Sequence, residues 1–301
     1  MTRIALLSAC IAIAACSPQG EAQKAPPAAS TSAAPAPAPA VASPAVKLYA
    51  MDCGALEFKD VDMFADDGSM KGVARKFVDS CYLIRHPKGD LVWDTGVPEA
   101  IADMPGGLTP KDFPVHIVVP KKITAQLGEL GLSPTDIEYV SFSHKDFDHV
   151  GNGGLFAAST WIVDSDERAA MFSDDARKSQ DFASYQALEN AKTELIEGDA
   201  SRDVFGDGSV VIHQAPGHTP GHTVLLVKTA GSGKILLTGD MWHLAESRDK
   251  RLVPSFNFNR EQTIASMDKV EALAKDNNAR VVRQHVAEDV ASLPAFPKAL
   301  E

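Results

Sequence analysis

Apolar residues in this chain fall mostly into short runs bounded by Gly, Pro, Asn, Asp or Ser, a pattern that predicts β-strands. The predicted strands cover residues 46–51, 77–85, 90–93, 137–142, 160–163, 193–197, 204–205, 209–214, 223–228, 234–237 and 280–283. Gly206-Asp207-Gly208 predicts a hairpin between two of them. Along the chain, the predicted order is therefore many strands first, followed by strands mixed with helices.

Helical spacing of apolar residues occurs in two longer segments, 121–130 and 261–276. Gly131 is expected to end the first, and Asn259 to cap the second. A short helix is expected after 160–163, with Asp164 or Ser165 as its cap. This order of elements suits two packed sheets covered by helices, with a site at the sheet edges.

The first residues have the pattern of a targeting segment. Residues 4–15 form an apolar run that is too short to span a bilayer as a helix. Residues 13–16, Ile-Ala-Ala-Cys, resemble a bacterial lipobox, in which Cys16 is lipidated and becomes the mature N-terminus. Lipidation at Cys10 and an ordinary cleaved signal peptide are the alternatives. Because Ser17 rather than Asp follows, we expect a lipoprotein of the outer membrane, on its periplasmic face.

Residues 17–46 are dominated by Ala, Pro and Ser, a composition that predicts an extended, mobile tether. One folded domain, 47–301, remains, without an internal repeat of fixed period. The net charge of −11 argues against nucleic acid as a partner. Membrane contact is thus expected through the N-terminal lipid only, and the oligomeric state stays undetermined.

Two cysteines, Cys53 and Cys81, belong to the predicted domain. An oxidising periplasm permits a disulfide between them, and two independent buried thiols are the alternative. A zinc site made of cysteines is excluded because the chain has no C-x-x-C motif.

The strongest chemical signal is the stretch 143–149, Ser-His-Lys-Asp-Phe-Asp-His, directly after a predicted strand. Buried ionisable groups at this density must be compensated, and a divalent metal ion does this well. Three later stretches could complete such a site. They are 215–222, Ala-Pro-Gly-His-Thr-Pro-Gly-His; 237–240, Leu-Thr-Gly-Asp; and 284–285, Gln-His. His and Asp on open loops suit catalytic zinc, iron or manganese better than a structural site.

These motifs together resemble the metallo-β-lactamase superfamily, whose signature is H-x-H-x-D-H followed by separate His, Asp and His ligands. Residues 47–49, 81–84, 92–96 and 215–222 are more similar to its N-acyl-homoserine lactonase branch, and the resemblance covers essentially all of 47–301. It implies an αββα sandwich, in which two packed mixed sheets are flanked by helices.

The resemblance also implies a centre of two divalent ions, zinc in the first place and iron or manganese as alternatives, with a mononuclear site as the simpler option. Its ligands would be His144, Asp146 and His218 around one ion, Asp148, His149 and His285 around the other, and Asp240 between the two.

The sequence departs from the family at Asp146, where histidine is usual. Aspartate is shorter, so it reaches the metal only if the loop or the ion shifts. Its charge would make the metals weaker Lewis acids and would favour iron or manganese without excluding zinc.

Other polar residues receive supporting roles. His222 is expected beside the ligands rather than among them, and Asp94 should orient a ligand or a turn through hydrogen bonds. His243 is a candidate for the substrate pocket. The remaining histidines of the domain, His86, His116 and His213, are expected to be ordinary surface or loop residues.

The activity that the resemblance implies is hydrolysis of a lactone, most directly an N-acyl-homoserine lactone. A hydroxide that bridges the metals would attack the carbonyl, and Asp148 would orient it and shuttle a proton. No Ser or Cys nucleophile is needed. A β-lactamase, an iron-dependent redox protein of the same fold and a metal-poor binding lipoprotein are the alternatives.

Overall fold

A computed structural model describes residues 45–301 of the 301-residue chain. The predicted signal peptide, the lipidation at Cys16 and nearly all of the predicted tether lie outside the described residues. Val46, at the end of that tether, already packs in the core with 1% of its surface exposed. Within residues 45–301, no helix is both long and apolar enough to cross a membrane.

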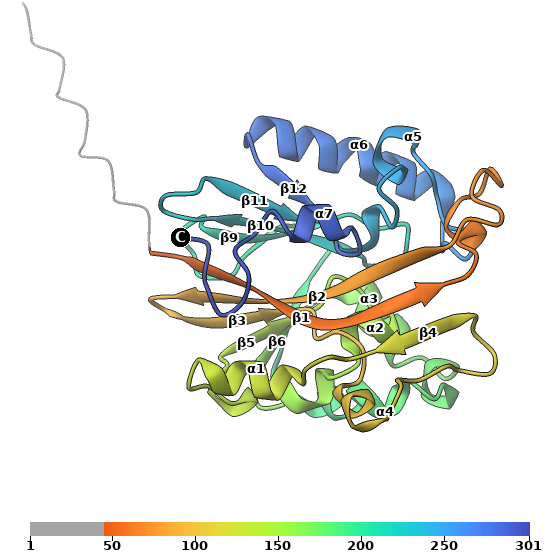
Figure 1. The fold of residues 1–301 in the computed structure, drawn as a ribbon. Helices are drawn as coiled ribbons and strands as arrows, with labels where there is room; N and C mark the ends of the chain where they lie inside the picture. Colours follow the sequence, from red (N-terminus) through yellow and green to blue (C-terminus); the bar gives the residue numbers. More distant parts are fainter. Residues whose placement is uncertain (1–44) are drawn as a thin grey trace, which may run out of the picture. The chain divides into compact units, whose positions relative to one another are not determined.

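Two mixed β-sheets form the centre of the domain (Figure 1). The larger sheet has the order β4-β1-β2-β3-β5-β6-β7 and the smaller one the order β12-β11-β10-β9-β8. The strands of the larger sheet are β1 Lys47–Phe58, β2 Arg75–His86, β3 Gly89–Trp93, β4 Val115–Val118, β5 Tyr139–Ser141, β6 Thr160–Asp164 and β7 Thr193–Ile196. Those of the smaller sheet are β8 Arg202–Asp203, β9 Val210–Gln214, β10 Thr223–Lys228, β11 Lys234–Leu237 and β12 Arg280–Val282.

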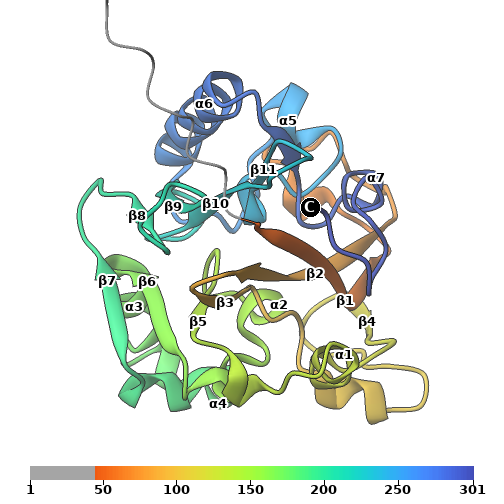
Figure 2. The same ribbon diagram turned by 90° about the vertical axis from the view of Figure 1, so that its left-hand side faces the viewer.

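Helices cover the outer faces of both sheets, as Figures 1 and 2 show for α6 on the smaller sheet and α1 on the larger one. The α-helices are α1 Ile123–Glu129, α2 Phe147–Val150, α3 Ser165–Met171, α4 Phe182–Tyr185, α5 Ser247–Lys250, α6 Arg260–Asp276 and α7 Ala287–Val290. Short 3-10 helices lie in the connections at Asp62–Phe64, Glu99–Asp103, Pro134–Asp136, Gly153–Phe156, Ala176–Lys178, Gln186–Asn190 and Gly239–Met241. The predicted αββα sandwich is confirmed.

The alternation of side chains along β2 explains the layering. Tyr82 and Ile84 pack in the core between the two sheets, whereas Cys81 and Leu83 face the cluster that includes α1. Because successive strand residues point to opposite faces, a strand buried on both sides belongs in a central layer.

The predicted helix caps are correct. The Asn259 side chain accepts a hydrogen bond from the Gln262 N–H at the start of α6, and Asp164 caps α3. Met267 and Val270 of α6 pack on the smaller sheet.

Three strand predictions were wrong in detail. The first predicted strand, 46–51, covers only part of β1, which continues to Phe58. β4 was not predicted, because its four residues are stabilised by pairing with the distant β1. The first strand of the predicted hairpin is β8, Arg202–Asp203, and not residues 204–205. Val204 and Phe205 instead bury their side chains in the core between the sheets.

The cysteine alternatives are resolved in favour of a disulfide, since Cys53 and Cys81 are bonded across β1 and β2 with a Cα–Cα distance of 5.8 Å. The prediction for His86 was wrong. Its ring is buried against Phe205, with 4.1 Å between ring centroids, and its Nε2 lies 2.9 Å from Asp207 Oδ2. The 206–208 turn folds over it, a long-range contact that local sequence does not encode. His116 and His213 are half-buried.

Candidate metal centre

Loops that follow β5, β9, β11 and β12 carry the candidate ligands to one end of the two sheets. After β5, the chain makes a single helical turn, α2, with Asp146 at its N-cap position. The N–H groups of His149 and Val150 both donate to the Asp146 carbonyl oxygen, at 2.9 and 3.1 Å. This tight turn brings the side chains of Asp146, Asp148 and His149 to one surface. In an extended segment, successive side chains would point to opposite sides.

The first ligand group consists of His144, Asp146 and His218. Asp146 Oδ2 lies 3.4 Å from both His144 Nε2 and His218 Nε2. Ligand atoms held at about 2.0–2.2 Å from one ion lie roughly 3–4 Å from one another. The three atoms are therefore close enough to fit around a single divalent ion, and the Asp146 carboxylate lies within reach of both rings.

The second group consists of Asp148, His149 and His285. Asp148 Oδ1 lies 3.9 Å from His149 Nε2, and Asp148 Oδ2 lies 3.7 Å from His285 Nε2. His285 reaches this group from the loop after β12, and its Nδ1–H donates to the Val78 carbonyl oxygen at 2.9 Å, which leaves Nε2 free to bind a metal.

Asp240 stands between the two groups, in the 3-10 turn after β11. Its Oδ1 lies 3.2 Å from His149 Nε2 and 3.0 Å from His285 Nε2. Its Oδ2 lies 3.6 Å from His144 Nε2 and 3.7 Å from His218 Nε2. One oxygen thus faces each group, which is the arrangement of a carboxylate that bridges two ions.

Four candidate ligand atoms of this centre have no hydrogen-bond partner in the described part of the chain, as expected for atoms that bind a metal ion. Among the described residues, no hydrogen bond reaches His144 Nε2, His149 Nε2, His218 Nε2 or Asp240 Oδ1, all of them buried. Buried polar atoms without partners are costly, and divalent ions would remove that cost at each of them.

Electrostatics around the same atoms agree with this interpretation. Burial, reinforced by His149, lowers the pKa of His144 to about 3, so its ring is neutral and able to bind metal. Burial opposes ionisation of Asp240, but the surrounding imidazoles, His285 foremost, hold its pKa well below the usual range. Burial lowers the pKa of His285, but the Asp240 and Asp148 carboxylates together raise it to about 9. Metal binding would therefore displace a proton from this cluster.

Asp94 accepts hydrogen bonds from a candidate ligand, His149, and from the loop that carries it. It is fully buried, and its Oδ2 lies 3.1 Å from His149 Nδ1, which donates to it. Its Oδ1 accepts from the Ser143 N–H at 2.6 Å. A Cβ at Gly96, whose φ is +67°, would overlap Cys53, so the turn that carries Asp94 rests directly on the disulfide.

His222 lies beside the ligands, as predicted. Its Nε2 accepts a hydrogen bond from the Asp240 N–H at 3.1 Å, and its Nδ1–H donates to the Ala215 carbonyl oxygen at 3.1 Å. Both ring nitrogens are thereby used, and the ring holds the backbone of Asp240 in place.

Sequence reasoning missed Glu167, a buried carboxylate on α3. Its Oε1 accepts from the Lys145 N–H at 2.7 Å, and its Oε2 accepts from the Gly221 N–H at 2.8 Å. It therefore joins two of the ligand loops. A glutamate in the first turn of a helix looks like an ordinary dipole partner, so the sequence carried no signal of this role.

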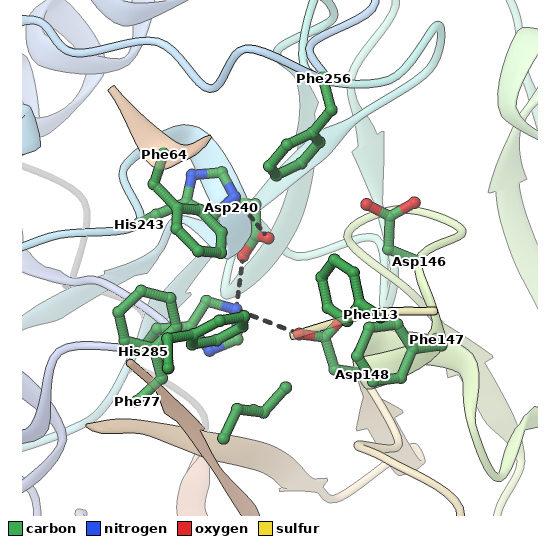
Figure 3. Close-up of a pocket in the computed structure, with 12 residues that line it drawn as sticks. Phe64, Phe77, Phe113, Asp146, Phe147, Asp148, Asp240, His243, Phe256 and His285 are labelled. Atoms are coloured by element: carbon green, nitrogen blue, oxygen red, sulfur yellow. Dashed lines mark ion pairs between the residues drawn. The ribbon is translucent and has the colours of Figure 1, made fainter. Parts of the chain in front are cut away.

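The cavity in front of the centre was also missed, because its aromatic residues are scattered along the chain (Figure 3). Its walls are Leu56, Phe58, Phe64, Phe77, Phe113, Phe147 and Phe256, and its floor includes Asp148, Asp240 and His285. His243, predicted as a pocket residue, does line this cavity. A wider, mainly apolar groove shares Phe113, Phe147 and Phe256 with it.

Residues 75–285 match the model of the metallo-beta-lactamase superfamily. This match, together with the two-sheet fold and the arrangement of the site, shows that the chain belongs to that superfamily. The superfamily predicted from the sequence motifs is thus confirmed.

Its relatives include N-acyl homoserine lactonases. The N-acyl homoserine lactonase AttM of Azorhizobium caulinodans is 30% identical over 267 residues, which are 84% of this chain and 97% of that enzyme. An N-acyl homoserine lactonase of a Bacillus species is 31% identical over 223 residues, 72% of this chain and 85% of that one. A solved N-acyl homoserine lactone hydrolase, with the product N-hexanoyl-L-homoserine at its catalytic metal center, has a TM-score of 0.71 at 25% identity. That similarity covers 84% of this chain and 98% of the other.

Proposed function

We propose that this protein is a metal-dependent hydrolase that opens the ester ring of an N-acyl-homoserine lactone or a related lactone. The observation that carries the proposal is the pair of ligand groups on either side of Asp240, at the floor of an apolar cavity. The relatives named N-acyl homoserine lactonases, matched over most of both chains, support the choice of substrate class.

The centre would hold two divalent ions, through His144, Asp146 and His218 on one side, Asp148, His149 and His285 on the other, and Asp240 in common. Ions bound there supply a Lewis acid for the carbonyl and lower the pKa of water into the neutral range. Zinc is the metal that we expect first, with iron or manganese as alternatives.

Asp148 is the residue that we assign to proton transfer. Its carboxylate faces the cavity beside Asp240 and His285, where a bound carbonyl would lie (Figure 3). Water adds to the carbonyl carbon, the ring C–O bond breaks, and the proton released by water passes through Asp148 to the alkoxide.

Aromatic side chains exclude water from the reacting groups and provide the surface for an apolar substituent. Phe113, Phe147 and Phe256 line both the cavity and the wider groove, so an acyl chain can extend from the ring into that groove. The charged residues at the centre and the apolar walls together fit a small polar ring that carries a hydrocarbon tail.

The test uses the purified protein, its metal content, and assays on N-hexanoyl-homoserine lactone and on a β-lactam. We expect close to two ions per chain, lactone opening detected by acid release, and a loss of at least about a hundredfold in rate for His144→Ala and Asp240→Ala. Full activity in either variant, well under one ion per chain, or rapid β-lactam cleavage without lactone opening would overturn the proposal.

We also propose that the chain is a lipoprotein anchored through Cys16 on the periplasmic face of the outer membrane. The apolar run before Cys16 and the tether composition support this location. Metabolic labelling with a fatty acid tests it: wild-type protein should carry label and fractionate with outer membranes, and Cys16→Ser should do neither. Equal labelling of both proteins contradicts the assignment.

A further inference from the structure

His243 lies three residues after Asp240, just beyond the 3-10 turn, and only 3% of it is exposed. Figure 3 shows its ring next to Asp240 on the side away from Asp148. A residue that only contacts substrate would be expected to present a polar atom to the open cavity. The position of its Nε2 suggests a different role.

The Nε2 atom of His243 lies 2.9 Å from Asp240 Oδ2, the same oxygen that faces His144 and His218. Ligand atoms of His218, Asp240 and His243 all lie within 4.8 Å of one another. The rings of His218 and His243 are 4.9 Å apart between centroids and inclined by 70°. The His218 and His243 rings therefore both lie beside Asp240 Oδ2.

The approach of His243 Nε2 to Asp240 Oδ2 is that of a close ion pair and not of a well-aligned hydrogen bond. Although the two atoms are only 2.9 Å apart, His243 Nε2 is buried and makes no hydrogen bond of acceptable geometry anywhere in residues 45–301. His144 Nε2 and His218 Nε2 share this property. Two ligand atoms of one ion lie close together without being aligned for a hydrogen bond, as His243 Nε2 and Asp240 Oδ2 do.

The surroundings of the ring provide no other partner. Phe64 and Phe256 pack at 5.1 and 6.0 Å between centroids, and His285 stacks parallel at 6.2 Å. These contacts fix the ring plane but cannot satisfy Nε2. A buried imidazole nitrogen without a hydrogen-bond partner is unfavourable, and metal binding would remove that cost.

We infer that His243 is a direct ligand of the ion held by His144, Asp146 and His218. This inference rests on the proposed metal centre and adds a ligand to it. The ion would have three imidazole and two carboxylate ligands, the latter from Asp146 and Asp240. The third imidazole replaces the nitrogen donor that the motif lacks at Asp146, so selectivity returns towards zinc.

The test compares the purified full-length protein with His243→Phe, which keeps an aromatic ring in the cavity but removes both nitrogens. Metal content after dialysis, chelator competition and the absorption spectrum of the Co(II)-substituted protein are measured. His213→Phe, the same substitution at a half-buried site on β9, is the matched control.

We expect the parent and His213→Phe to bind two ions with the same Co(II) spectrum. In His243→Phe, one ion should bind at least about a hundredfold more weakly, beyond the effect of losing a supporting hydrogen bond, and the visible band should shift. His243→Ala provides a second measurement, because added imidazole should restore the parent spectrum if the ring nitrogen binds the ion.

Two results would overturn the inference. If His243→Phe keeps both ions at parent affinity with an unchanged spectrum and only raises KM, then His243 contacts substrate instead, while the metal centre stands. If the parent itself binds no metal, the proposed function fails together with the inference.

Discussion

Asp94→Asn should selectively weaken the ion held by Asp148, His149 and His285. Asp94 is the fully buried carboxylate that accepts from His149 Nδ1 at 3.1 Å and from the Ser143 N–H at 2.6 Å. Asparagine has the same shape but only one acceptor oxygen. If that oxygen keeps the Ser143 bond, an amide N–H group faces the His149 N–H group, and the ring loses the partner that holds its tautomer.

The size of the effect follows from these contacts. A hydrogen bond to a charged group contributes about 1.5–3 kcal/mol, and an unpaired buried donor costs about 1–3 kcal/mol. We therefore expect a loss of about 2.5–6 kcal/mol in the free energy of unfolding. Loss of a carboxylate behind a metal-binding histidine typically weakens binding by about 10–100-fold, which is about 1.4–2.8 kcal/mol.

Chelator competition and urea unfolding measure these two quantities. Asp79→Asn is the matched control, because it is the same change at another buried carboxyl near the site. One oxygen of Asp79 accepts from the Val97 N–H at 2.8 Å, and the other has no partner among the described residues. Burial, followed by Asp148, raises the pKa of Asp79 to about 7, so at neutral pH the amide replaces a carboxyl that is only partly ionised. Equal metal affinity in Asp94→Asn and the parent would refute the reasoning.

Two further predictions concern stability. The disulfide closes a loop with a sequence separation of 28. Replacing both Cys53 and Cys81 with Ala should therefore lower the free energy of unfolding by about 3–4 kcal/mol, and an unchanged urea midpoint would contradict this. Burial raises the pKa of Asp164 from 3.8 to about 6. The pKa of Asp164 is thus higher in the folded than in the unfolded state. Its contribution to the free energy of unfolding is therefore fully present below pH 3.8 and is lost as the pH rises through about 6. Asp164→Asn keeps the α3 cap, so the free energy of unfolding should fall less between pH 4 and 6 in this variant than in the parent. Urea unfolding of the metal-free proteins measures this difference. An equal fall in both proteins would contradict the prediction.

Local pattern was sufficient wherever a short segment determines its own conformation. Strands β10 and β11 match the predicted 223–228 and 234–237 at both ends, since apolar runs bounded by turn residues need no distant partner to be recognised. The Asn259 cap was predictable for the same reason, because its bond to Gln262 N–H spans three residues.

Features that depend on contact between distant segments were decided only by the tertiary structure. β4 exists because it pairs with β1, and His86 is buried because Phe205 and Asp207 fold over it. The choice between disulfide and free thiols depended on the register of β1 against β2, which no composition reveals.

The sequence by itself determined which residue types could bind metal and, through a recognisable spacing, which fold would present them. Only the tertiary structure decided that Asp240 turns one oxygen to each ligand group and that His243 Nε2 approaches Asp240 Oδ2. The physical reason is that ligand identity is chemistry carried by each side chain, whereas coordination depends on ångström-scale distances between atoms on separate loops. Those distances follow from the packing of two sheets and their helices.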